Sequence, residues 1–237
     1  MKTAAAILAV SLLLLFHPSS SDGADESVRP TARYALTLPH GHIKATWQKT
    51  GIAEADTLAE RKVMEDAERF KAQVEELAGD MKSMDMPMPK CELNITAAAM
   101  PGGRTMGVLW AVYEYLGGAH GNLTLESRIY HEQRMKNGKR TLRVLEMGDL
   151  FRSPAAAVRA FSEYSRAELL NRGLDPSMVE PGTAPSAENF SVFLLSNDGI
   201  VLFFEPYQVA PWADGTIRLN VPLERLKSAG PNMAYWK

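Results

Sequence analysis

Cysteine is almost missing from this sequence, since Cys91 is the only one among 237 residues. An intrachain disulfide framework is therefore excluded, and a chain of this length can bury enough apolar surface to fold without one. Cys91 alternates with Leu93 and Ile95, a pattern that predicts a buried, inert thiol on a strand rather than a reactive one. Paired cysteines spaced for a zinc site are also absent from the sequence.

An excess of charge of one sign is lacking as well. The sequence holds 26 basic and 28 acidic residues, which gives a formal net charge of -2. Such a balance offers no general attraction to nucleic acid or to an anionic membrane, and we expect no nucleic-acid partner. Hydrophobic residues make up 46% of the chain, which is typical of a packed globular protein and excludes a disordered one.

Long hydrophobic runs are lacking beyond the first 20 residues, so we expect no membrane-spanning helix there. Residues 1–21 themselves have the pattern of a secretory signal peptide, with Lys2 before an apolar run from Ala4 to Phe16 and small residues after it. A retained N-terminal anchor is the alternative, although the run is short for a span. We therefore expect an exported protein, periplasmic or extracellular, with no transmembrane span after signal cleavage.

Helices and strands do not alternate regularly along the chain. An apolar stripe from Val63 to Met81 predicts a long helix that begins near Glu54 and ends near Gly79. The pair Ser153-Pro154 predicts the start of a second helix that runs to about Asn171. We therefore expect an α+β fold of antiparallel sheets with these two helices packed on them. Strands are predicted near residues 34–38, 91–99, 108–115, 123–129, 142–145, 192–195, 200–204 and 217–221, with a hairpin turn at Asn137-Gly138, a loop over 174–188 and a short helix after Pro222.

Complete catalytic signatures are absent from the sequence, including the G-x-S-x-G elbow and the phosphate-binding glycine loop. One unusual segment spans residues 113–122 and carries three glycines within five residues at the end of a predicted strand. Such glycines predict a tight bend, with His120 inside it and Tyr115 just before it. His120 is then either a functional group or a histidine that stabilises the turn. The structural turn residues of this segment are Gly117, Gly118 and Gly121.

A second unusual segment, residues 204–215, mixes aromatic, acidic and rigid residues directly after an apolar strand. Tyr207 and Trp212 could stack on a sugar or on a partner protein, or could pack in the core. Pro206, Pro211 and Gly215 would steer the chain. We expect no bound metal and no cofactor. The candidate ligand-binding residues from both segments are Tyr115, His120, Glu205, Tyr207, Trp212 and Asp214.

Four methionines gather in one short stretch, at positions 81, 84, 86 and 88. Thioethers are soft ligands, so such a cluster in an exported protein could bind Cu(I). The other interpretation is an adaptable loop that packs on the core. No histidine or second cysteine joins the cluster, which favours the loop.

Three stretches resemble motifs of PdaC/RsiV-like extracellular proteins. Residues 115–121 look like the family's Y-x-G-G-A-H-G motif, 146–151 like its L-x-D-L-F motif, and 189–215 like its C-terminal signature. Residues 22–31 are polar, acidic and contain a proline, which predicts a linker after the signal peptide. The resemblance implies a PdaC N-terminal-type domain over 32–122 and an RsiV C-terminal-type domain over 123–237, the two packed as one unit.

In some members of this family the module precedes a polysaccharide deacetylase domain, and in others it is the lysozyme-sensing part of an anti-sigma factor. The paired-Asp and His-x-x-x-His metal patterns of the deacetylase are missing from this sequence. The resemblance therefore implies a cell-envelope binding module that recognises a cell-wall glycan or a wall-degrading protein such as lysozyme, rather than an enzyme. Two alternatives stay open: a hydrolase that uses His120 with Glu205 or Asp214, metal-assisted or by acid–base chemistry, and an envelope scaffold protein.

Overall fold

The computed structural model describes residues 29–134 and 140–236. The predicted signal peptide, residues 22–28 of the predicted linker and the predicted turn at Asn137-Gly138 lie outside these ranges. Among the described helices, none combines the length and the hydropathy that crossing a membrane requires.

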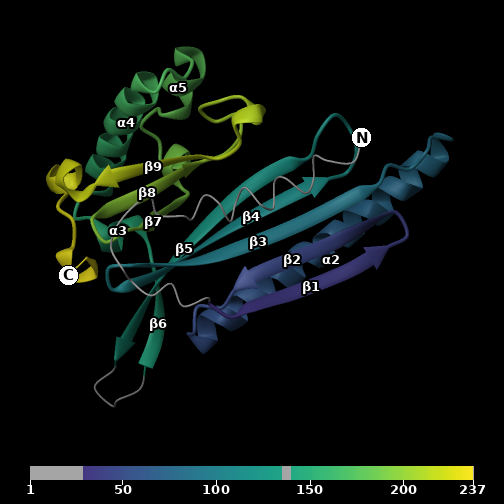
Figure 1. The fold of residues 1–237 in the computed structure, drawn as a ribbon, viewed down its shortest axis with the longest axis horizontal. Helices are drawn as coiled ribbons and strands as arrows, with labels where there is room; N and C mark the ends of the chain where they lie inside the picture. The colour runs from purple at the N-terminus through teal and green to yellow at the C-terminus, as the bar shows by residue number, and fades with distance from the viewer. Residues whose placement is uncertain (1–28, 135–139, 237) are drawn as a thin grey trace. The chain divides into compact units, whose positions relative to one another are not determined.

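The chain forms two sheets with helices packed on them, which confirms the predicted α+β class (Figure 1). One sheet has the strand order β1-β2-β3-β4-β5-β6 and the other the order β7-β8-β9. The chain divides into two compact units, unit 1 with residues up to 98 and 111–122, and unit 2 with residues 99–110 and those from 123 onwards. Strands β3 and β4 contribute residues to both units.

Unit 1 contains a crossover that the sequence analysis missed. Strands β1 (Thr31–Leu38) and β2 (Gly41–Gln48) pair antiparallel, but β2 pairs parallel with β3 (Cys91–Gly102). The long helix α2 (Ala53–Ser83) joins β2 to β3 and provides the crossover that parallel neighbours need. The expected sheet was purely antiparallel because only one strand was predicted before this helix.

Helix α2 runs along β1 and β2 and buries its apolar stripe, as predicted (Figure 1). Its start is fixed by Asp56, whose Oδ1 accepts the backbone N–H of Thr50 at 2.6 Å and its hydroxyl at 2.7 Å. The helix extends to Ser83, one turn beyond the predicted end at Gly79. The buried residues of its stripe include Val63, Ala67, Phe70 and Val74.

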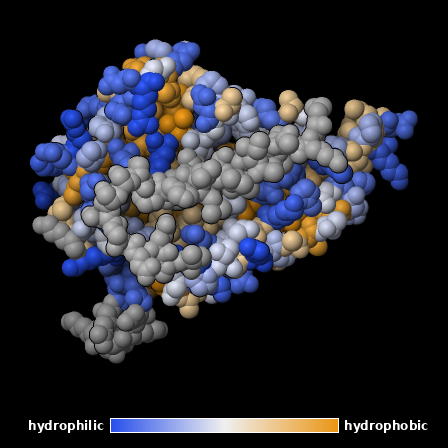
Figure 2. Space-filling model, viewed as in Figure 1, coloured by the Kyte–Doolittle hydropathy of each residue, from blue (hydrophilic) through white to orange (hydrophobic). Residues whose placement is uncertain are grey.

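Met84 and Met86 lie directly after α2 and are about half exposed to solvent. Figure 2 shows pale-orange hydrophobic residues beside blue hydrophilic ones at this end of the helix. The expectation that the methionine segment is a loop that packs on the core is wrong for Met84 and Met86, whereas Met81 and Met88 are half-buried.

Unit 2 is built around aromatic side chains. Phe161 of helix α4 (Pro154–Asn171) is fully buried and contacts the rings of Phe151, Phe190 and Phe193. Helix α4 starts as predicted, because the Ser153 hydroxyl accepts the N–H of Ala156 at 3.3 Å and Pro154 follows it. The strands of this unit are β3 and β4 (Thr105–Tyr115), each in part, together with β5 (Asn122–Arg134), β6 (Arg140–Leu145), β7 (Phe193–Leu195), β8 (Gly199–Phe204) and β9 (Ile217–Pro222).

The loop predicted over residues 174–188 is wrong in part. Helix α5 (Pro176–Gly182) lies within it, and the Asp175 carboxylate caps its start by accepting the N–H of Ser177 at 2.8 Å. The helix predicted after Pro222 is confirmed as the 3-10 helix η3 (Leu223–Ala229). Shorter helical turns are α3 (Met147–Leu150), η1 (Glu188–Phe190), η2 (Trp212–Asp214) and η4 (Met233–Tyr235).

Candidate functional site

The segment between β8 and β9 forms a turn that several hydrogen bonds hold in unit 2. The Tyr207 N–H donates to the Ala210 carbonyl at 2.9 Å, and the Gln208 N–H donates to the Glu205 carbonyl at 3.0 Å. The Gln208 side-chain amide then donates to the carbonyls of Gly182 at 3.1 Å and of Asn189 at 2.9 Å. The turn is therefore attached to α5 and η1 rather than loose at the surface.

Tyr207 lies at the tip of this turn in a strained conformation. Its φ of 70° is in the left-handed region, which bulky L-residues avoid because Cβ comes too close to the following carbonyl oxygen. The side chain is 57% exposed, and its ring centroid lies 6.0 Å from that of Trp212 with 37° between the planes. We call Tyr207 and Trp212 the aromatic platform.

Asp214 belongs to the same turn, and its side chain is exposed. The 3-10 turn η2 carries both Trp212 and Asp214, so the carboxylate lies two residues from the platform. Gly215 ends this turn with a φ of 67°, a conformation that glycine adopts without strain. The fold thus places three of the predicted site residues, Tyr207, Trp212 and Asp214, on one connected turn.

Glu205 has a different environment. Its Oε1 accepts the backbone N–H of Leu125 on β5 at 2.5 Å, and its own N–H donates to the Gln208 side chain at 3.3 Å. A carboxylate that accepts a backbone N–H makes a strong, charge-assisted hydrogen bond. Glu205 therefore attaches the start of the turn to β5.

The predicted tight bend at residues 117–121 belongs to unit 1. The Tyr115 hydroxyl donates to the Gly118 carbonyl at 3.0 Å, and Nδ1 of His120 lies 2.8 Å from the Gly121 carbonyl. Gly118 has a φ of 98°, and a Cβ at Gly121 would come within 2.5 Å of the Tyr113 ring. These contacts give Tyr115 and His120 a part in stabilising the bend.

The hydrolase alternative needs His120 together with Glu205 or Asp214. His120 belongs to unit 1, whereas both carboxylates belong to unit 2. Within unit 2 the Glu205 carboxylate is held by β5, as described above. No group of three or more histidine, cysteine or acidic side chains is placed to hold a metal ion within residues 29–134 and 140–236.

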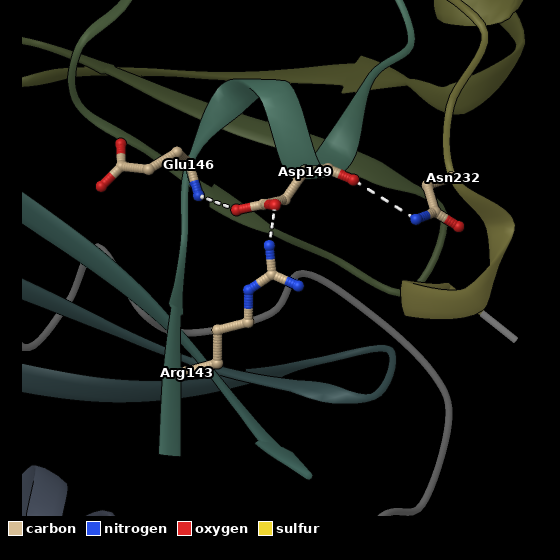
Figure 3. A network of polar contacts seen from close by, with 4 residues as sticks. All are labelled: Arg143, Glu146, Asp149 and Asn232. Carbon is tan, nitrogen blue, oxygen red and sulfur yellow. Dashed lines mark hydrogen bonds and ion pairs between the residues drawn. The ribbon is translucent and has the colours of Figure 1, made fainter. Parts of the chain in front are cut away.

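The motif at residues 146–151 forms a polar network at the surface of the protein (Figure 3). The Asp149 carboxylate accepts the Glu146 N–H at 2.9 Å and forms a hydrogen-bonded ion pair with the guanidinium of Arg143. The Asn232 amide donates to the Asp149 main-chain carbonyl at 3.3 Å. Asp149 thus ties β6, α3 and the segment before η4 to one another.

A groove of about 650 Å³ lies between α4 and η3, and the sequence analysis did not identify it. Arg159, Glu163 and Tyr164 line it from α4, and Arg225 lines it from η3. The Arg225 guanidinium lies 5.9 Å from the centre of the Tyr164 ring, so this ring face already carries a cation. The repeated four-residue spacing of Ala156 and Ala160 on α4 was the available signal, because small side chains leave a hollow on a helix face.

Comparison with family models identifies part of unit 2. Residues 148–224 match a family described as "Protein of unknown function (DUF3298)", and this range includes the aromatic platform. Two solved members of that family share the fold of this chain. One, from Bacteroides fragilis, has a TM-score of 0.55 at 13% identity and covers 89% of this chain and 98% of its own. The other, from Pseudomonas aeruginosa, has a TM-score of 0.50 at 17% identity and covers 85% of this chain and 94% of its own.

Two curated relatives are similar over shorter stretches. The chain is 31% identical over 110 residues to peptidoglycan-N-acetylmuramic acid deacetylase PdaC of Bacillus subtilis, which is 45% of this chain and 22% of that enzyme. It is 25% identical over 141 residues to immunogenic protein MPT64 of Mycobacterium tuberculosis, which is 58% of this chain and 59% of that protein. The chain therefore spans less than two thirds of either relative. Residues 148–224 thus match the DUF3298 family model, and the chain is similar in sequence to part of a peptidoglycan deacetylase and in fold to solved DUF3298 proteins.

Proposed function

We propose that this protein is an exported cell-envelope binding protein that recognises cell-wall glycan through the aromatic platform of Tyr207 and Trp212. The observation that carries the proposal is the strained and exposed Tyr207. A left-handed conformation costs a bulky residue about 1–2 kcal/mol, and such strain gathers at functional sites. Three hydrogen bonds from Gln208 hold the turn that imposes it.

The aromatic platform and the nearby Asp214 carboxylate offer the two kinds of contact that a sugar can make. The faces of Tyr and Trp rings are large and apolar and pack against the C–H faces of a pyranose ring. The exposed Asp214 carboxylate, two residues from Trp212, can accept hydrogen bonds from sugar hydroxyls. Glu205 acts in this scheme by holding the turn on β5, and Tyr115 and His120 at the bend in unit 1 are further candidate contact residues.

The relative PdaC supports the choice of ligand, because its name states that it acts on peptidoglycan. Only 22% of that enzyme is matched, so the resemblance supports recognition of the same polymer and leaves deacetylation aside. The signal peptide that the sequence predicts at residues 1–21 supports the same choice, because it would export the protein to the compartment that contains this polymer.

The test is titration calorimetry of residues 22–237 with soluble muropeptides and with N-acetylglucosamine oligomers. We expect the double variant Tyr207→Ala, Trp212→Ala to lose affinity by about tenfold to hundredfold, because truncation of exposed aromatic anchors typically costs that much. The matched control is Tyr164→Ala in the same unit, since the Tyr164 ring lies under Arg225 in the groove between α4 and η3. Unchanged affinity in the double variant would overturn the platform assignment, and a loss in the control alone would move the site to the groove.

A wall-degrading protein such as lysozyme is the second candidate ligand. An aromatic pair with an exposed member, such as Tyr207 beside the half-buried Trp212, is also typical of the energetic centre of a protein interface. Capture of lysozyme by the immobilised chain, tested beside the glycans with the same variants, separates the two ligands. Capture that depends on the platform while glycans leave it unoccupied would favour the protein partner.

A further inference from the structure

The end of helix α2 carries an arrangement that the proposed function does not use. Methionines 81, 84, 86 and 88 account for four of the twelve in the sequence and lie within eight residues. We call these four residues the methionine cap. Met84 is 57% exposed and Met86 is 53% exposed, more than any other large aliphatic side chain among the described residues. Packing in the core does not account for apolar side chains that are this exposed to solvent.

The backbone of the cap brings two of these methionines together. The Met86 N–H donates to the Met81 carbonyl at 2.9 Å, and the Asp85 N–H donates to the Lys82 carbonyl at 3.3 Å. Asp85 has a φ of 52°, so the pair of bonds closes the helix as a Schellman motif. In this motif a contact between the side chains at these two positions is common. The bond from the Met86 N–H to the Met81 carbonyl therefore holds the backbones of these two residues next to each other.

The remaining two methionines are placed by their spacing. Met84 is the C-cap residue of α2 and follows Met81 by three residues, a spacing that places two residues on the same side of a helix. Pro87 and Pro89 follow Met86 and Met88 directly, and a proline holds the residue before it in extended backbone. The backbone after the helix is therefore restricted to extended conformations at Met86 and Met88.

We propose that the methionine cap is a binding site for Cu(I), held by the thioether sulfurs of Met81, Met84 and Met86, with Met88 as a fourth neighbour. Thioethers are soft, neutral ligands, and they select Cu(I) over the harder divalent cations that prefer nitrogen and oxygen. A thioether carries no proton to lose, so metal binding at such a site does not compete with protons. The exposure of Met84 and Met86 leaves the site open to an incoming ion.

Cys91 is the other soft ligand near the cap, and the fold sets it apart. Its side chain is fully buried at the start of β3, and Sγ lies 3.7 Å from the Pro89 carbonyl. Burial also raises the pKa of this thiol, which keeps the proton that a metal would have to displace. The site is therefore made of thioethers, and its occupancy does not depend on Cys91.

The experiment titrates residues 22–237 with Cu(I) under anaerobic, reducing conditions against the chromophoric chelator bicinchoninate. We expect the chain to take up one Cu(I). The double variant Met84→Leu, Met86→Leu should bind Cu(I) about tenfold more weakly or worse, because two of the ligands are lost. Leucine keeps the volume and the helix propensity of methionine, so the fold survives, which circular dichroism verifies. The matched control is Met64→Leu, an exposed methionine on the same helix with 38% exposure, which should bind as the unaltered chain does.

Two further measurements test whether thioether sulfurs bind the ion. Cys91→Ala should retain full uptake. Ag(I), a soft ion that needs no reductant, should bind equally at pH 5.5 and pH 7.5 by native mass spectrometry, because thioethers do not titrate. Absence of uptake, uptake that persists in the Met84→Leu, Met86→Leu variant, or uptake that disappears in Cys91→Ala would each overturn the proposal.

Discussion

The Glu205 carboxylate accepts the backbone N–H of Leu125 at 2.5 Å, across 80 positions of the sequence. Leu125 is buried on β5, whereas Glu205 opens the turn that carries the aromatic platform. One hydrogen bond therefore joins a strand of the large sheet to the start of the proposed binding turn. The residue expected to meet the ligand is instead in a position to hold the turn.

Replacement of Glu205 tests this role. Glu205→Ala leaves the buried N–H of Leu125 without its acceptor, and we expect a loss of about 1–3 kcal/mol in the free energy of unfolding, measured by urea denaturation. Glu205→Gln keeps a carbonyl acceptor and should lose less than the alanine variant. Equal unfolding midpoints for both variants and the unaltered protein would show that the bond contributes nothing.

The strain at Tyr207 leads to a prediction that separates stability from binding. Glycine adopts a φ of 70° without penalty, whereas alanine keeps the clash of Cβ. Both substitutions remove the aromatic ring, so Tyr207→Gly should be more stable than Tyr207→Ala by about 1 kcal/mol in urea denaturation. Both should bind glycan equally weakly. An alanine variant as stable as the glycine variant would remove strain as an argument for function.

Local signals account for the elements that the sequence predicted well. Ser153 and Pro154 start α4 through contacts within four residues, so the pattern alone was sufficient. The same signal at Asp175 and Pro176 starts α5, but the prolines and small residues around it favoured a loop. Strand β2 was missed, and with it the parallel pairing, because that pairing joins residues on either side of a 31-residue helix.

The candidate site was predictable in part, because local composition carries part of its signal. The composition of residues 204–215 indicated an aromatic segment at an edge or in a loop and left open whether its rings face solvent or the core, and the structure has Tyr207 exposed beside Trp212. The left-handed conformation of Tyr207 was not predictable, since no glycine stands at that position and bonds from distant Gly182 and Asn189 to Gln208 hold the turn. Long-range hydrogen bonds of this kind leave no periodic trace in a sequence.

The network around Asp149 offers a test of pairing between charges (Figure 3). Asp149→Ala removes the acceptor of both Arg143 and the Glu146 N–H, and we expect a loss of about 1–2 kcal/mol in unfolding free energy. Arg143→Ala removes only a half-exposed ion pair and should cost less than about 1 kcal/mol. A double-mutant cycle by thermal denaturation measures the coupling of the two residues. Strictly additive effects would show that the ion pair is not coupled.

Cys91 is expected to lower the free energy of unfolding of the protein at alkaline pH. The thiol is fully buried, and burial raises its pKa, whereas in the unfolded chain a cysteine titrates near a pKa of about 8.5. Above that pH the unfolded chain releases a proton that the folded chain retains. The free energy of unfolding should therefore be unaffected by this thiol below about pH 8.5 and should fall as the pH rises further.

The measurement compares urea unfolding at pH 7.5 and pH 9.5 in the unaltered protein and in Cys91→Ala. Tyr130 is also buried with a raised pKa, but an unfolded tyrosine titrates only near a pKa of about 10, so its effect begins at higher pH. The unaltered protein should lose more stability between the two pH values than the alanine variant does. A thiol-specific reagent should in addition label Cys91 at least about a hundredfold faster in urea than in buffer, because access requires opening of β3. Equal pH dependence in both proteins, with rapid labelling of the folded chain, would show that Cys91 is accessible.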